Sequence, residues 1–178
     1  KAINHDSTEG VLMKYFLFFV LSLSFAAFAD SPRQIFLSRH MEKATSGQDP
    51  ALSPCGVAQA QAFAAQLKNR QLPWLMHTPY QRTKQTAEAF SQQGRQLLSY
   101  DPRQLDQLST ELNNKAGNVL VIGHSNTIPA LVAKLTGETV APLTEQDYGR
   151  IYILTEQGKQ WLLKIEQLPT PPPCQATR

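Results

Sequence analysis

The chain has 178 residues, of which 42% are hydrophobic and 17% are charged, with a formal net charge of +3. This length suits one ordinary domain, and this composition excludes a disordered or fibrous protein. The positive charges form no basic stripe or cluster, so nucleic acid is not an expected partner.

The N-terminal region has the features of a secretory signal peptide. Residues 13–29 read MKYFLFFVLSLSFAAFA, with one lysine, an apolar stretch and a small-x-small ending before Asp30. The apolar stretch is shorter than the about 20 residues that a membrane-spanning helix needs. We therefore predict cleavage after Ala29, a periplasmic or secreted protein, and no stable membrane span after cleavage. An uncleaved membrane anchor is the alternative.

This prediction divides the chain into three parts. Residues 1–12 contain no methionine and are expected to be an upstream extension that is not part of the native protein. Residues 13–29 are the predicted signal peptide. Residues 30–178 are expected to form a single domain with a proline-rich C-terminal tail.

The two cysteines, Cys55 and Cys174, form an even pair. In an exported protein such a pair suggests a disulfide, here between the proline-rich tail and the first helix of the domain. A bridge that closes so long a loop would stabilise the fold by roughly 4 kcal/mol in the chain-entropy model. Two free thiols are the alternative. Neither cysteine lies near a histidine at metal-ligand spacing, so a zinc site is not expected. We predict no metal and no cofactor.

Apolar runs alternate with amphipathic stretches along the domain, and Ser53 with Pro54 marks a helix start. In chain order, the pattern predicts a strand over 34–37, a helix from Pro54 to about Arg70, a strand over 74–76, a helix over 81–90, a strand over 96–100, a helix to about Lys115, a strand over 118–122, a helix over 127–135, and a hairpin over 150–154 and 160–165.

Strands separated by helices imply βαβ units and a largely parallel sheet. The final hairpin adds antiparallel strands at one edge. We predict an α/β fold, a three-layer α/β/α sandwich with a mostly parallel central sheet and an antiparallel C-terminal hairpin.

Residues capable of catalysis follow the predicted strands. In strand order these are Arg39 and His40, then His77 and Arg82, then Asp101, and then His124. Ligands bind beyond the carboxyl ends of parallel strands, so these side chains are expected to meet at one edge of the sheet.

The set fits phosphoryl transfer without a metal. A neutral imidazole such as that of His40 can attack phosphorus and form a covalent phosphoenzyme. Two arginines, Arg39 and Arg82, can clamp phosphate oxygens, and a protonated His124 can donate one more hydrogen bond.

Three motifs resemble the histidine phosphatase superfamily, which includes the phosphoglycerate mutases. They are Arg39-His40 after the first strand, the run TPYQRTKQTA over 78–87, and VIGHS over 121–125; LSPCG over 52–56 also resembles that family. The resemblance spans about residues 34–165. It implies that His40 is the phosphorylated nucleophile and that Arg39, Arg82 and His124 complete the phosphate pocket.

The residues after the nucleophile depart from the common Arg-His-Gly pattern. Met41-Glu42-Lys43 gives an Arg-His-x-Glu-Lys motif, similar to the Arg-His-Ala-Glu-Lys of small exported members. Lys43 is a candidate contact for a substrate phosphate, and a solvated surface lysine is the alternative. The rim of the pocket is expected to include His77, Asp147 and Tyr148, with no role assigned.

Two carboxylates are candidates for the general acid. Asp101 holds the position after the third strand where many relatives place a carboxylate, although Asp before Pro is also a common turn and cap. Glu42 is the competitor. Relatives that act on phosphohistidine need no strong acid, because their leaving group is an imidazole.

The sequence therefore predicts an exported, monomeric phosphomonoesterase that acts through a phosphohistidine on His40. Its substrate would be a phosphorylated small molecule, an envelope sugar phosphate or a phosphoprotein. A phosphohistidine-protein phosphatase and a non-catalytic phosphate-binding protein of the same fold are the alternatives. A mutase is disfavoured, because the domain has little room for the insertions that cap larger relatives.

Overall fold

The computed structural model describes residues 31–91 and 95–174. The predicted upstream extension and signal peptide lie outside these residues. The elements are β1 (Gln34–Arg39), α2 (Pro54–Gln66), β2 (Trp74–His77), α3 (Gln81–Glu88), β3 (Gln96–Ser99), α4 (Leu105–Asn114), β4 (Val119–Gly123), α5 (Thr127–Thr136), β5 (Arg150–Gln157), β6 (Gln160–Gln167) and the short 3-10 helix η1 (Pro172–Cys174).

The strands form one mixed sheet in the order β3-β2-β4-β1-β5-β6. The first four strands in that order pair in parallel, whereas β5 is antiparallel to both β1 and β6. The predicted α/β fold, with its parallel centre and antiparallel hairpin, is confirmed. Gly158, with a φ of +62°, begins the two-residue turn of that hairpin, where a left-handed backbone favours glycine.

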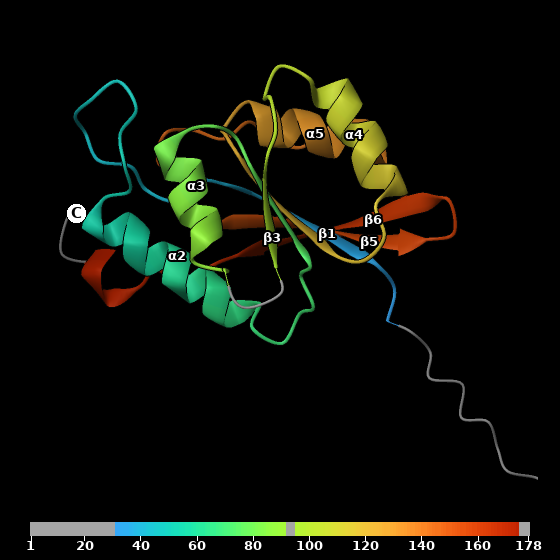
Figure 1. Cartoon of the computed structure of the whole chain (residues 1–178), viewed down its shortest axis with the longest axis horizontal. Coiled ribbons are helices and arrows are strands. Elements are labelled where there is room, and N and C mark those ends of the chain that lie inside the picture. Colours follow the sequence, from blue (N-terminus) through green and yellow to red (C-terminus); the bar gives the residue numbers. More distant parts are fainter. Residues whose placement is uncertain (1–30, 92–94, 175–178) are drawn as a thin grey trace, which may run out of the picture. The chain divides into compact units, whose positions relative to one another are not determined.

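Helices cover both faces of the sheet, α2 and α3 on one and α4 and α5 on the other (Figure 1). The side chains of β1 alternate between the two faces, as the twofold period of a strand requires. Ile35 and Leu37 pack with Leu112 and Leu131, whereas Phe36 packs in a second cluster. That second cluster includes Phe63 of α2 and Ala87 of α3. These two cores make the three layers of the sandwich.

Helix α2 begins as the sequence predicts but ends earlier. Ser53 is the N-cap, its Oγ accepts the Gly56 N–H at 3.0 Å, and Pro54 occupies the first turn. The helix ends at Gln66 rather than near Arg70. The Arg70 N–H turns back to the Leu67 carbonyl at 2.9 Å, which brings the chain towards β2.

The C-terminal tail returns to the start of α2, where η1 packs (Figure 1). There Cys55 and Cys174 form a disulfide, with their Cα atoms 5.0 Å apart. In the described part of the chain, no helix is both long enough and apolar enough to span a bilayer.

The register of the parallel strands aligns their carboxyl ends. Arg39 at the end of β1 is opposite Gly123 at the end of β4, and His77 at the end of β2 is opposite Ile122. The residues that follow these three strands therefore leave the sheet at the same edge.

Candidate active site

His40 is held rigidly at the end of β1. Its backbone N–H donates to the Gly123 carbonyl at 2.9 Å, and its side chain is buried. The ring atom Nδ1 lies 2.7 Å from the Met41 carbonyl oxygen. Because a carbonyl only accepts, Nδ1 carries the ring hydrogen and donates it. The neutral ring therefore keeps its lone pair on Nε2, as a nucleophile requires.

Burial also keeps this imidazole uncharged. Desolvation lowers the pKa of His40 from 6.5 to about 3, opposed by the hydrogen bond to Met41. The charges of Arg39, His124 and Arg82 lower the pKa in the same direction as burial. The nucleophilic form therefore predominates at neutral pH without a separate base to remove a proton.

The Arg39 guanidinium is 2% exposed and held by the segment before β5. Its Nη1 donates to the Thr144 carbonyl at 2.5 Å, and its Nη2 pairs with Glu145 at 3.1 Å. The guanidinium also lies over the Tyr148 ring, 4.4 Å from its centroid. Its buried Nε has no hydrogen-bond partner among the described residues.

Arg82 of α3 repeats this arrangement. Its Nη1 donates to Asp49 at 3.3 Å, its guanidinium lies 4.6 Å from the Tyr80 ring centroid, and its Nε is buried with no partner in the described chain. A buried donor without a partner costs about 1–3 kcal/mol. Each of the two arginines therefore keeps one N–H donor available for an anion.

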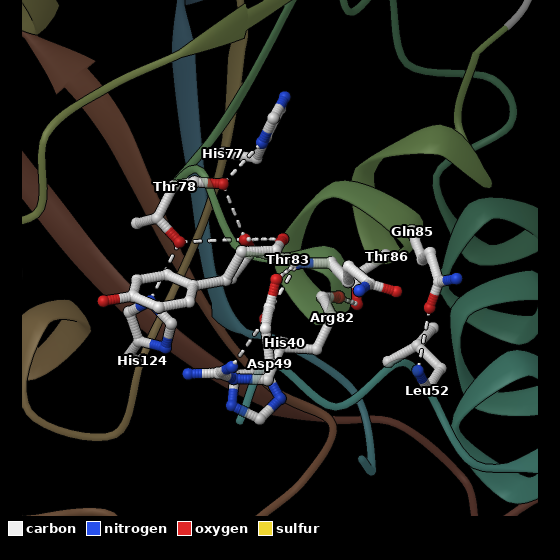
Figure 2. Close-up of polar contacts among 12 residues, drawn as sticks. His40, Asp49, Leu52, His77, Thr78, Arg82, Thr83, Gln85, Thr86 and His124 are labelled. Atoms are coloured by element: carbon white, nitrogen blue, oxygen red, sulfur yellow. Dashed lines mark hydrogen bonds and ion pairs between the residues drawn. The ribbon is translucent and has the colours of Figure 1, made fainter. Parts of the chain in front are cut away.

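The rest of the motif on α3 fixes the loops around His40. Thr86 Oγ1 accepts the Met41 N–H at 3.1 Å. Gln85 Oε1 accepts the Leu52 N–H at 2.8 Å (Figure 2). Helix α3 therefore supplies Arg82 and also anchors the segment that follows His40.

His124 follows β4 and faces His40, with ring centroids 5.5 Å apart. Its Nε2 lies 2.9 Å from Thr78 Oγ1. Burial lowers the pKa of His124 to about 4, and Arg82 and Arg39 lower it in the same direction. His124 is therefore neutral at neutral pH when the site holds no anion. Figure 2 shows His40, Arg82 and His124 gathered beside α3.

Asp101 lies after β3, but its carboxylate is occupied. Both oxygens accept from the Arg103 side chain at 2.8–3.2 Å, and Oδ1 also accepts the Arg103 backbone N–H at 2.9 Å. These bonds lower the pKa of Asp101 to about 2. Together with Tyr80, the pair lines a shallow hollow of about 570 Å³.

Glu42 and Lys43 take part in local structure. Glu42 Oε1 accepts the Ser53 hydroxyl at 2.6 Å, at the N-cap of α2. Lys43 forms a β-bridge with Leu52, and its Nζ lies 3.9 Å from Glu145 Oε2. Lys43 is thus near the carboxylate that pairs with Arg39.

The three rim residues have distinct surroundings. Tyr148 lies beside His40, with the two ring centroids 6.2 Å apart. Asp147 accepts from Thr144 at 2.7 Å and so fixes the turn whose carbonyl binds Arg39. His77 is buried and donates from Nδ1 to the Thr78 carbonyl at 2.6 Å.

Sequence reasoning did not find Asp49, Thr83 or Glu145, and it placed Thr78 after the second strand without a role. Asp49 and Glu145 lie in segments between elements, and each is far along the chain from the arginine that it binds. The TPYQRT run contained Thr78 and Thr83, but no spacing rule pointed to their contact with His124. Among the described residues, no group of three or more His, Cys, Asp or Glu side chains could hold a metal ion.

Comparison with solved structures shows a shared fold. The protein histidine phosphatase SixA in complex with tungstate superposes with a TM-score of 0.66 and 22% identity, over 81% of this chain and 99% of that one. The mycobacterial glucosyl-3-phosphoglycerate phosphatase with inorganic phosphate gives 0.64 and 14%, over 78% and 98%. The alpha-ribazole phosphatase from Shigella flexneri gives 0.61 and 13%, over 75% and 96%.

No curated protein matches the chain by sequence. The model of the histidine phosphatase superfamily (branch 1) matches residues 35–106, a range that includes His40 and Arg82. His124 lies beyond that range, at the end of β4 in the shared fold. The chain is therefore similar to the histidine phosphatase superfamily over residues 35–106, and it shares the fold of the protein histidine phosphatase SixA.

Proposed function

We propose that the protein is a phosphomonoesterase that acts through a phosphohistidine on His40. The lone pair of His40 Nε2 forms the P–N bond while the P–O bond to the leaving group breaks, and that bonding pair stays on the leaving oxygen. Water then attacks phosphorus, the P–N bond breaks, and the neutral imidazole is restored. Arg39, Arg82 and His124 bind the phosphoryl oxygens throughout.

One observation carries this proposal: the neutral His40 ring, with the lone pair on Nε2, lies among arginine N–H donors that bind no other group of the described chain. Arg39 Nε and Arg82 Nε are buried without a partner among the described residues, and both cations act on His40. A phosphoryl group is an anion whose oxygens suit such donors. Binding it would satisfy both N–H groups at the nucleophile.

The proposal is tested with phenyl phosphate as the substrate. His40→Ala should abolish turnover, and a rapid acid-free quench of the parent should trap one phosphoryl group on His40. His77→Gln is the matched control, because His77 is also buried and also donates from Nδ1 to the next residue's carbonyl. The control should keep most of the activity. Wild-type turnover in His40→Ala would rule out the mechanism.

A phosphohistidine-protein phosphatase is the second candidate. In favour of it, Asp101 is bonded to Arg103 and Glu42 to Ser53, so neither candidate acid is free to protonate a poor leaving group. The likeness to the protein histidine phosphatase SixA supports the same candidate. If a phosphohistidine peptide is hydrolysed far faster than envelope sugar phosphates and phenyl phosphate, this second function is the correct one.

A non-catalytic phosphate-binding protein would behave differently. It would bind inorganic phosphate, or trap one phosphoryl group per chain, without turnover of any ester or phosphohistidine. The free Nε2 of His40 argues for turnover instead.

We also propose that the protein works outside the cytoplasm, in the periplasm or the medium. The signal-like segment over 13–29 supports this, and so does the Cys55–Cys174 disulfide, a bond that persists in oxidising compartments. The N-terminal residue of the exported protein should be Asp30, and a start at Met13 would contradict cleavage.

A further inference from the structure

Two buried threonines connect His124 to the backbone through a series of short polar contacts (Figure 2). His124 Nε2 lies 2.9 Å from Thr78 Oγ1, and Thr78 Oγ1 lies 2.8 Å from Thr83 Oγ1. Thr83 Oγ1 in turn lies 2.8 Å from the carbonyl oxygens of both Thr78 and Tyr80.

Counting hydrogens along this series fixes its direction. Carbonyl oxygens only accept, so the single hydroxyl hydrogen of Thr83 points to the carbonyls. The contact between the two hydroxyls then needs the hydrogen of Thr78, which Thr83 Oγ1 accepts. Thr78 Oγ1 has no hydrogen left for His124, so it must accept one from His124 Nε2. If Thr78 instead donated to His124, the hydrogen of Thr83 would have to point to Thr78 Oγ1. The carbonyl oxygens of Thr78 and Tyr80 would then face Thr83 Oγ1 with no hydrogen between them.

We infer that Thr78 is a positioning residue: it fixes His124 with its hydrogen on Nε2, so that His124 Nδ1 meets the substrate as an acceptor and selects a phosphate that carries a hydrogen. This inference rests on the proposed phosphatase function. With Nε2 bound to Thr78, Nδ1 is the remaining ring nitrogen for a phosphoryl oxygen.

The charges around His124 agree with this assignment. Arg82 and Arg39 disfavour a second proton on the ring, and burial acts the same way, whereas Asp49 acts in the opposite direction. The aromatic neighbours are Tyr80 and neutral His40, with ring centroids 5.1 Å and 5.5 Å away. In the free protein the ring is therefore neutral above about pH 4.

A phosphomonoester monoanion provides the missing hydrogen. Its P–OH can donate to His124 Nδ1, whereas the dianion would set a lone pair against a lone pair. When His40 Nε2 bonds to phosphorus and the P–O bond breaks, this hydrogen is available to the leaving oxygen. The number of protons balances, because the proton that enters with the substrate leaves with the alcohol. No carboxylic acid is needed.

The tautomer can be measured without activity. In the full-length protein labelled with ¹⁵N-histidine, the His124 signals are those lost in His124→Asn. In the parent, Nε2 should show the shift of a protonated nitrogen and Nδ1 that of an unprotonated one. In Thr78→Val the two tautomers should mix, and Thr78→Ser should restore the parent spectrum. A hydrogen on Nδ1 in the parent protein would overturn the inference.

The pH dependence of the kinetics tests whether the protein selects the monoanion of the phosphomonoester over the dianion. The second pKa of a phosphomonoester is about 6, so kcat/KM should fall above about pH 6. The pH at which kcat/KM falls should differ between an alkyl phosphate and a nitrophenyl phosphate. That difference should equal the difference between the second pKa values of the two substrates. An identical falling limb for both substrates would refute monoanion selection.

The same assay tests Thr78. Thr78→Val should lower kcat/KM by about tenfold, the effect of losing one hydrogen bond, and Thr78→Ser should keep parent activity. Parent-like kinetics in Thr78→Val would refute the positioning role. Absence of turnover in the parent would instead contradict the proposed function, and the NMR measurement would still decide the tautomer.

Discussion

Two histidines at neighbouring strand ends are prepared for different tasks by the hydrogen bonds behind them. His40 donates the hydrogen on Nδ1 to the Met41 carbonyl, which leaves Nε2 with its lone pair as the proposed nucleophile. His124 is bound at Nε2 by Thr78, which leaves Nδ1 for the substrate. Both rings have a lowered pKa because of burial and adjacent guanidinium groups. The backbone and two hydroxyls thus decide which nitrogen of each ring is left for the proposed substrate.

The ion pair of Asp101 gives a prediction about the source of the proton. With a pKa of about 2, this carboxylate is ionised at every working pH and has no proton to donate. Asp101→Asn should therefore change kcat for phenyl phosphate by less than about threefold, whereas losing a general acid typically costs about 10²–10⁴-fold. Steady-state rates across pH 4–8 provide the measurement.

Arg103→Ala is the companion variant for Asp101. It removes the cation that holds the carboxylate, so the pKa of Asp101 should rise towards its usual range. If Asp101→Asn alone lowers kcat a hundredfold, Asp101 is the acid, and Arg103 must release it when the substrate binds.

At the scale of elements, α2 lies directly against the chain that follows His40. A Cβ built on Gly56 would lie 1.9 Å from the Glu42 carbonyl oxygen, a backbone atom that cannot rotate away. Gly56→Ala should therefore push α2 and residues 42–43 apart and lower the free energy of unfolding by about 3 kcal/mol, the upper range for overpacking. Urea unfolding measures this loss.

Val57→Ala is the matched control for Gly56→Ala. Val57 is the next residue of α2 and is 45% exposed, so its truncation should change the free energy of unfolding by less than about 0.5 kcal/mol. Equal stability of the two variants would show that the contact between Gly56 and Glu42 is not tight.

The sequence predicted these elements because local patterns encode them. A short continuous apolar run marks β1, which is buried on both faces, Ser53-Pro54 marks the start of α2, and the run 118–122 marks β4. The end of α2 was placed too late, because the turn at Arg70 depends on a backbone bond to Leu67 rather than on a helix-breaking residue.

The site was partly predictable for a related reason. Motifs at strand ends named His40, Arg82 and His124, because parallel strands bring their carboxyl ends together. The partners of those residues depend on contacts between distant segments, such as Asp49 with Arg82, for which no local pattern exists.

At the scale of the whole molecule, the sheet order places the site at its centre. Strand β1 lies between β4 and β5, so His40 emerges beside His124 on one side. On the other side, the segment leading into β5 supplies the Thr144 carbonyl and the Tyr148 ring that hold Arg39. Segments more than a hundred residues apart therefore meet at the candidate site, and the site forms only when the full sheet has assembled.

The disulfide closes a long covalent loop, because Cys55 and Cys174 are separated by 119 positions in the sequence. Closing a loop of this length restricts the unfolded chain, so Cys55→Ala/Cys174→Ala should lower the free energy of unfolding by about 4 kcal/mol. Because His40, Arg82 and His124 lie on other elements, kcat of the folded variant should stay within about twofold of the parent.

Reduction provides the internal control for the disulfide. Dithiothreitol should lower the urea midpoint of the parent to that of the double variant and should leave the double variant unchanged. The tail also packs on α2 through η1. Cys174→Ala and the double variant both lack the disulfide, so any difference between their free energies of unfolding measures packing at Cys55 rather than loop closure. A parent protein whose unfolding curve does not respond to reductant would show that the two thiols are free, and the oxidising compartment would lose its structural support.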